Sequence, residues 1–196
     1  HTGSAQNNLT QTTAADQPII NNGGTLQTDS SGNAALDFNG STHHLVLETG
    51  FAHTINVSGI AAYTVFEPDD VAGTQIVSSL ASYSNTLNRF YNPWIGDSSF
   101  KYSYGTANPF TSGSSNTNLN LSSLVADQTQ GDAKAFLNGS QVGSATALVN
   151  KAGQRSDTTV GVGAVADSSH FDGKMGEFIW YTGQSVSVNR EQIESN

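Results

Sequence analysis

The sequence predicts an all-β domain, a two-sheet antiparallel β-sandwich of the jelly-roll type with a short C-terminal helical turn. Three observations predict it. Short apolar runs alternate with clusters of Gly, Asn, Ser and Asp, which is the pattern of strands and turns. The chain has 196 residues, a length that suits one sandwich-sized domain. Before the last residues, no stretch shows the 3.6-residue apolar period of a long helix.

The most apolar run, residues 171–181, is predicted to be the central strand. Side chains alternate along a strand, so Met175 and Ile179 should share one face while Phe178 and Trp180 occupy the other. Because both faces carry large apolar groups, this strand should be buried within a layered fold.

The beginning of the chain is predicted to be an extended arm, residues 1–28, preceding a single domain, residues 29–196. The arm is rich in Asn, Gln, Thr and Ala, so it should become ordered by pairing with a sheet edge, anchored mainly by Ile19 and Ile20. The domain should open with a hairpin over residues 35–47 that turns at Asn39-Gly40.

The remaining elements follow from alternation and turn residues. The dipeptide Asn138-Gly139 predicts a tight hairpin, and the Ser/Asn-rich residues 106–118 predict a long surface loop. Ser185 or Ser187 should cap the terminal helical turns. Further strands are expected at residues 60–66, 75–82, 119–127 and 133–142.

Composition excludes several classes of function. The formal net charge is −9 with 7 basic residues, which argues against binding to nucleic acid or to anionic membranes. There is no cysteine, so neither a disulfide framework nor a thiolate site can form. No apolar run approaches the roughly 20 residues of a membrane span.

Four motifs give the chain a resemblance to a known family. The run Phe-Asp-Gly-Lys-Met-Gly-Glu-Phe-Ile-Trp-Tyr at residues 171–181, with the Arg-Glu-Gln-Ile segment after it, resembles the closing strand and helix of laminin-G-like domains. Residues 35–47, 135–142 and 159–163 match the earlier strands of the same pattern. These domains belong to the concanavalin A-like lectin and glucanase superfamily. The resemblance implies the jelly-roll fold, but it leaves the function open among lectins, adhesion modules, virion proteins and hydrolases.

Catalysis is not predicted. A retaining glycosidase needs two carboxyl groups about 5–5.5 Å apart, and the nearest approach in this chain is Glu67-Pro68-Asp69-Asp70. Pro68 interrupts the strand alternation there, so these carboxylates are interpreted as a solvated turn. The pair His43-His44 is interpreted as part of a hairpin surface, because adjacent strand residues face opposite sides.

The densest aromatic cluster, residues 87–104, predicts a ligand-binding site. Sugar rings stack on Trp and Tyr, while Asn and Asp side chains can bind the hydroxyl groups. The predicted binding residues are Tyr91, Asn92, Trp94 and Asp97. Phe90 and Phe100 are assigned to the core instead.

The resemblance also implies a calcium ion at the rim of the sandwich. Carboxylate oxygens are ligands that Ca²⁺ prefers, and the predicted metal ligands are Asp157 and Asp167, which flank the glycine-spaced strand.

We expect a non-catalytic surface module of a virion, of the phage capsid decoration or tail-fibre type, or of another extracellular assembly. The opening Thr-Gln-Thr-Thr-Ala-Ala-Asp-Gln-Pro, residues 10–18, resembles arms of tailed-phage structural proteins. Its partners would be a glycan or other virion or surface proteins, a second copy of the chain being one option, but neither nucleic acid nor a membrane. The alternative is a carbohydrate-binding module of a secreted glycoside hydrolase.

Overall fold

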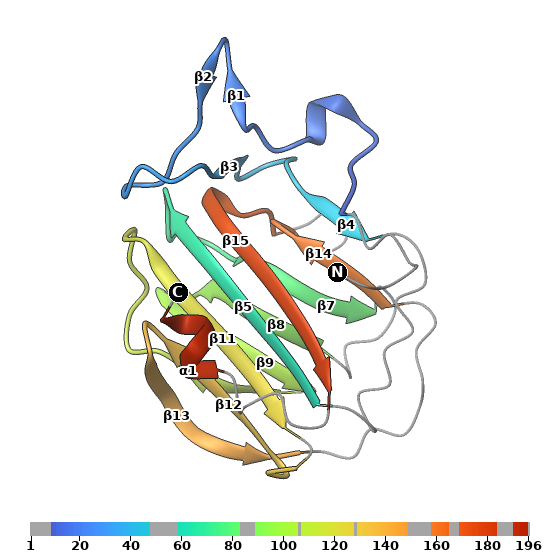
Figure 1. The fold of residues 1–196 in the computed structure, drawn as a ribbon, viewed down its shortest axis with the longest axis vertical. Helices are drawn as coiled ribbons and strands as arrows, with labels where there is room; N and C mark the ends of the chain where they lie inside the picture. Colours follow the sequence, from blue (N-terminus) through green and yellow to red (C-terminus); the bar gives the residue numbers. More distant parts are fainter. Residues whose placement is uncertain are drawn as a thin grey trace.

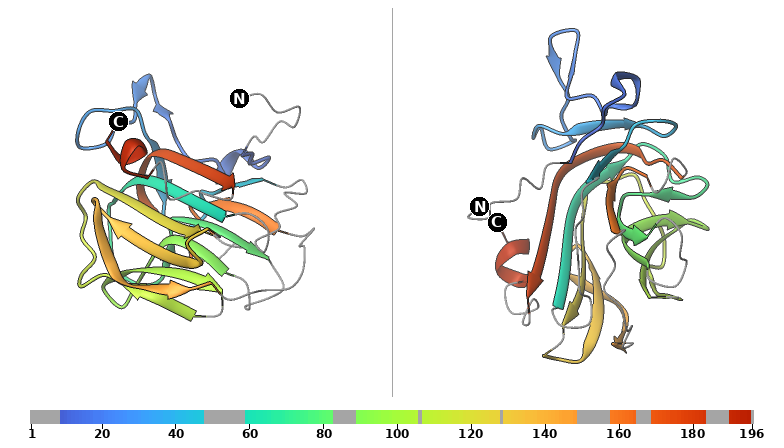
Figure 2. Two further views of the ribbon diagram at one scale, coloured as in Figure 1. Left: turned by 60° about the horizontal axis from the view of Figure 1, so that its bottom comes forward. Right: turned by 90° about the vertical axis from the view of Figure 1, so that its right-hand side faces the viewer.

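The computed structural model shows two antiparallel sheets stacked face to face (Figures 1 and 2), which confirms the predicted β-sandwich. It describes residues 9–47, 59–82, 89–105, 107–127, 129–148, 158–164, 169–183 and 190–195. We call the six-stranded layer sheet B and the seven-stranded layer sheet A. A two-stranded ribbon belongs to the N-terminal arm.

Sheet B contains the predicted central strand, β15 (Asp172–Gly183), which pairs with β5 (Gly59–Pro68) on one side and β3 (Leu36–Asn39) on the other. As predicted, Phe178 packs toward the core between the sheets while Ile179 packs on the outer face. Met175 lies on the side of Phe178, contrary to strict alternation, because the register shifts between Met175 and Glu177. The sheet continues from β5 through β11 (Asn120–Asp127), β12 (Asp132–Leu137) and β13 (Ser140–Ala147).

The hairpin between β12 and β13 turns where the sequence predicts it. Asn138 and Gly139 both have positive φ, 50° and 77°. A two-residue turn of this kind matches the twist of paired strands, and Asn-Gly is its preferred sequence.

Sheet A has an edge strand where a loop was predicted. β10 (Ala107–Thr111) pairs with β9 (Ser99–Gly105), so the prediction of a loop over residues 106–118 is wrong for its first part. Pro109 is tolerated because β10 has a partner on one side only. The other strands, in spatial order, are β8 (Arg89–Gly96), β7 (Ser78–Ser82), β14 (Thr158–Val162) and β4 (Leu45–Leu47), with β6 (Gln75–Ile76) beside β8.

The predicted hairpin over residues 35–47 does not form, because β3 belongs to sheet B and β4 to sheet A. The Asn39 side-chain oxygen accepts hydrogen bonds from the backbone N–H groups of Ser41, Thr42 and His43 at 2.9–3.1 Å. Since these donors are satisfied by a side chain, the chain can leave one sheet and cross to the other. His43 is buried after this turn, which corrects its assignment to the surface.

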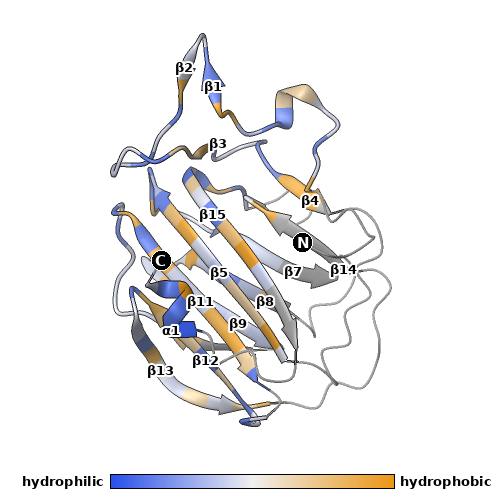
Figure 3. Cartoon of the chain, viewed as in Figure 1, coloured by the Kyte–Doolittle hydropathy of each residue, from blue (hydrophilic) through white to orange (hydrophobic). Residues whose placement is uncertain are grey.

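The space between the sheets is filled by aromatic and aliphatic side chains. Phe66 of sheet B meets Phe100 of sheet A edge to face, with ring centroids 5.3 Å apart. Orange, apolar segments are prominent on β4, β5, β11 and β15 in Figure 3. The largest fully buried side chains are Tyr102, Phe38, Phe66, Phe90, Phe100, Phe110 and Phe171.

The N-terminal arm crosses the open side of the sandwich, at the top of Figure 1. Thr10 pairs with Val46 of β4, and Ile19 pairs with Asp37 of β3, so the arm joins the edges of both sheets. Leu9 packs against the core, whereas Ile20 is 52% exposed; the anchors are therefore Leu9 and Ile19 rather than Ile19 and Ile20. The arm also contains a 3-10 turn, η1 (Ala14–Asp16), and the ribbon β1 (Asn21–Asn22) and β2 (Thr25–Leu26).

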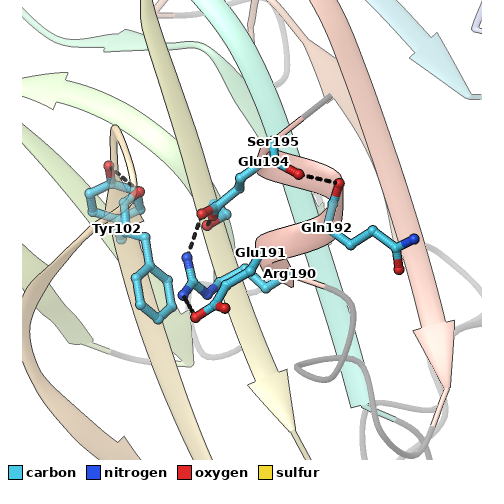
Figure 4. A network of polar contacts seen from close by, with 8 residues as sticks. Tyr102, Arg190, Glu191, Gln192, Glu194 and Ser195 are labelled. Carbon is cyan, nitrogen blue, oxygen red and sulfur yellow. Dashed lines mark hydrogen bonds and ion pairs between the residues drawn. The ribbon is translucent and has the colours of Figure 1, made fainter.

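The predicted C-terminal helical turn is α1 (Arg190–Glu194), which packs on the outer face of sheet B (Figure 4). Glu194 accepts a hydrogen bond of 2.6 Å from Ser123 of β11 and is ion-paired with Arg190. The Arg190 guanidinium lies 3.9 Å from the ring centroid of Phe136. The predicted caps, Ser185 and Ser187, lie outside the described residues. In the described part of the chain, no helix has the length and apolarity needed to cross a membrane.

Candidate functional site

The predicted binding residues lie on the β8–β9 hairpin of sheet A. Asp97 and Ser98 form its two-residue turn, with φ values of 50° and 57°, and Gly96 pairs with Ser99 where the strands leave the turn. Positive φ at both central residues makes this a twist-matched hairpin turn.

The hairpin presents different side chains on its two faces. Phe90, Ile95 and Phe100 point into the core between the sheets. Tyr91 and Trp94 form a separate cluster with Ile76 and therefore lie on the outer face of sheet A. On this outer face Trp94 is partly exposed and Tyr91 is buried, whereas α1 covers part of the outer face of sheet B.

Trp94 is the partly exposed member of this outer cluster. Its ring lies over Gly96: a Cβ atom built on Gly96 would stand 2.2 Å from Cζ3 of the indole. Any other residue at position 96 would displace the ring. The indole N–H is buried, and no atom of the described structure accepts a hydrogen bond from it, which is an unusual and costly state for a polar group.

Lys101 stands opposite Trp94 in the β8–β9 ladder. Its ammonium group is 4.8 Å from the centroid of the indole ring, within the range of a cation–π interaction. The same ammonium is ion-paired with Asp97 of the turn. The Lys101 side chain is 14% exposed and that of Asp97 is 90% exposed, so the carboxylate points into solvent and the ammonium lies against the sheet.

The ion pair changes the acidity of the turn residue. The hydrogen bond from Lys101, together with its positive charge, lowers the pKa of the fully exposed Asp97 carboxyl group below its ordinary value. Asp97 is therefore ionised throughout the neutral and mildly acidic range. Lys101 was missed among the predicted binding residues, although its position opposite the inward Phe100 and Tyr102 indicates the outer face.

Tyr91 packs in the same cluster as Trp94. The residue is 8% exposed and is paired across the sheet with Ser79 of β7 and Ser103 of β9. The structure thus places the buried Tyr91 beside Trp94, with Asp97 in the adjoining turn.

Asn92 is not part of this surface. It is 1% exposed, and its amide points between the sheets, where it donates a 2.8 Å hydrogen bond to the carbonyl oxygen of Ala62 in β5. Its side-chain oxygen accepts a 2.8 Å hydrogen bond from the Ser122 hydroxyl of β11. Asn92 therefore connects the two sheets, which corrects its assignment as a ligand-binding residue.

The loop after β10 adjoins the hairpin turn. The backbone N–H of Ser115 donates to the Ser98 carbonyl oxygen at 2.8 Å, and the Ser112 hydroxyl accepts from the N–H of Phe100 at 2.9 Å. The Ser115 hydroxyl, like the Trp94 indole N–H, is buried with no acceptor or donor for it among the described residues.

The predicted calcium ligands, Asp157 and Asp167, both lie outside the described residues. Within the described ranges, no three His, Asp or Glu side chains are grouped closely enough to hold a metal ion. The calcium site therefore stays a prediction.

Two carboxylates of the turn that contains Glu67 contact neighbouring elements. Glu67 accepts a 2.7 Å hydrogen bond from the backbone N–H of Ser30, and Asp69 is paired with Lys174 at 3.4 Å. These contacts connect strands β5 and β15 to neighbouring turns.

An apolar cavity of about 140 Å³ lies under the N-terminal arm. Leu9 and Ile20 of the arm line it, together with Leu36, Met175 and Phe178 of sheet B. Its walls offer few polar groups, so it does not suit a hydroxyl-rich ligand.

No protein-family model matches the chain, and no curated protein matches it in sequence. Solved structures do match its fold. The CBM40 module of the Ruminococcus gnavus IT-sialidase, solved with α2,3-sialyllactose, has a TM-score of 0.56 at 13% identity, covering 82% of this chain and 95% of the module. Domain 4 of AbnA, an extracellular GH43 arabinanase from Geobacillus stearothermophilus solved with arabinotriose, has a TM-score of 0.55 at 18% identity, covering 86% and 80%.

The Trypanosoma rangeli sialidase matches with a TM-score of 0.56 at 16% identity. The match covers 76% of this chain but only 25% of the length of that enzyme. These identities are 18% or lower, and the matches establish a shared β-sandwich fold. The finer resemblance to laminin-G-like domains stays a prediction.

Proposed function

We propose that this domain is a non-catalytic, extracellular carbohydrate-binding module that holds its ligand on the outer face of sheet A at the β8–β9 hairpin. The observation that carries the proposal is Trp94. It is a partly exposed indole whose ring lies against the ammonium of the Lys101–Asp97 ion pair.

The chemistry of this face fits a sugar. The apolar C–H face of a pyranose or furanose ring packs on an indole, and its hydroxyl groups need both acceptors and donors. Asp97 offers a carboxylate that is 90% exposed, to which sugar hydroxyl groups can donate hydrogen bonds. Trp94 offers the exposed part of its ring for stacking.

Two of the matched structures, the CBM40 module and domain 4 of AbnA, are parts of enzymes that act on glycans, and both were solved with a bound oligosaccharide. They cover most of this chain, which supports the carbohydrate-binding module over the virion surface protein expected first. None of the three matched structures described above is a virion protein. A role in virion assembly therefore stays a prediction.

The two tryptophans of the chain provide a direct test. Trp94 is on the outer face, whereas Trp180 packs in the core with its ring centroid 5.2 Å from that of Phe90. Titration with a panel of neutral oligosaccharides should shift the tryptophan fluorescence. Trp94→Phe should abolish the shift, while Trp180→Phe, the matched control, should keep it.

The affinity for the glycan should also depend on Trp94. Trp94→Ala should weaken binding by about 2 kcal/mol, roughly 30-fold, as is typical of a tryptophan at the centre of an interface. Circular dichroism and thermal unfolding would confirm that this variant is folded. Retention of full affinity by a folded Trp94→Ala, or binding to no glycan by the wild type, would overturn the proposal.

A further inference from the structure

The ammonium of Lys101 is the cationic group that the described structure places against the Trp94 ring. A glycan with carboxylate groups would be attracted by it. However, Asp97 is already bound to this ammonium, and its side chain is far more exposed than that of Lys101, 90% against 14%. An approaching ligand therefore meets the carboxylate first.

The position of Asp97 is held by the backbone as well as by the ion pair. Its φ of 50° places it at the first central position of the hairpin turn, three residues after Trp94 along the chain. The turn therefore keeps Asp97 next to the Lys101 ammonium, which lies over the indole.

Two consequences follow for the ligand. The positive charge of Lys101 is neutralised, so it contributes little attraction to an anion. The exposed carboxylate remains available to accept hydrogen bonds from sugar hydroxyl groups, and it repels a uronate or another acidic sugar.

We infer that Asp97 is a specificity-determining residue that restricts this site to neutral glycans by occupying Lys101. The inference rests on the proposed function and adds the class of ligand. It also makes a positive prediction: when Asp97 loses its charge, Lys101 becomes available, and the site gains affinity for acidic glycans.

The structure provides a conservative variant for the test. Asn is among the residues favoured in a hairpin turn with positive φ, so Asp97→Asn keeps the turn and removes only the charge. Lys101→Met removes the ammonium and keeps an unbranched side chain over the indole. The double variant, Asp97→Asn with Lys101→Met, is the matched control.

The experiment uses an array of uronate-containing polysaccharides, namely polygalacturonate, alginate, hyaluronan and glucuronoxylan, each beside its carboxyl-reduced, neutral form. The full chain and the three variants are applied at low and at high salt. Asp97→Asn should bind the acidic members on the order of tenfold more tightly than the wild type, as expected when one unit charge is removed near a ligand at the protein surface. The gain should shrink at high salt and should vanish in the double variant.

Two results would overturn the inference: no gain toward any acidic member in Asp97→Asn, or an equal gain in the double variant. A wild type that prefers acidic members to their neutral forms would also overturn it. These failures are distinct from that of the proposed function, which fails when Trp94→Ala and the wild type bind every glycan equally or not at all.

Discussion

Replacing Asn92 by alanine would decide between the two roles considered for this residue. Its amide group lies between the sheets, 1% exposed, and joins the Ala62 carbonyl to the Ser122 hydroxyl through two hydrogen bonds of 2.8 Å. Alanine at this position would leave both partners without this contact in an environment that water does not reach.

The cost can be estimated from these two bonds. A buried polar group that loses its partner costs about 1–3 kcal/mol. The Ser122 hydroxyl also has a side-chain hydrogen bond with Tyr102, so we expect a total cost of about 1–3 kcal/mol. A loss of this size is a large part of the roughly 5–15 kcal/mol that stabilises a typical domain. We therefore expect Asn92→Ala to be much less stable than the wild type.

Urea unfolding followed by tryptophan fluorescence measures this loss. The midpoint should fall while the slope of the transition stays unchanged, because the surface exposed on unfolding is the same. Asn22→Ala is the control: Asn22 is exposed on β1, and its substitution should change the stability by less than about 0.5 kcal/mol. A stable Asn92→Ala that has lost glycan binding would refute the structural role and restore the assignment predicted from the sequence.

Three other predictions follow from single contacts. Gly96→Ala places a methyl group 2.2 Å from Trp94, so it should abolish glycan binding, measured by titration, while the fold persists in circular dichroism. Burial and then the neighbouring carboxylates raise the pKa of Asp172, whose ionised form therefore destabilises the fold at neutral pH. Asp172→Asn should raise the thermal midpoint at pH 7, and this gain should disappear below the carboxyl pKa of the unfolded chain, about 3.9. Deletion of residues 1–20 exposes the edges of β3 and β4, so the truncated chain should unfold at lower temperature and associate at high concentration in size-exclusion chromatography.

The fold was predictable because local signals and burial agree along most of the chain. Asn138-Gly139 favours a two-residue turn with positive φ at both residues, and the structure has the predicted hairpin there. The Asn39-Gly40 dipeptide gave the same signal but a different result, since the side chain of Asn39 satisfies three backbone donors. The strands on either side of it, β3 and β4, pair with β15 and β14, which are distant in sequence, so their separation into two sheets is not visible from the dipeptide.

The candidate site was predictable in its residue types and only partly in its geometry. Aromatic residues beside Asn and Asp indicated a sugar-binding surface, and the structure places the buried Tyr91 beside Trp94, with Asp97 in the adjoining turn. Lys101 was missed because its contribution depends on the cross-strand pairing with Trp94, which requires the hairpin register to be known.

The register irregularity within β8 explains why the geometry departs from the prediction. Under strict alternation, Tyr91 and Trp94 are three residues apart and would point to opposite faces, which would bury one of them in the core. The pairing with β9 shifts between these two residues, and both point outward while the Asn92 amide points inward. A bulge re-aims the side chains that follow it, and the same effect places Met175 with Phe178 in β15. The outer cluster of Tyr91 and Trp94 therefore exists because of the irregularity, and the inward amide of Asn92, bonded to β5 and β11, holds that irregular segment against the opposite sheet.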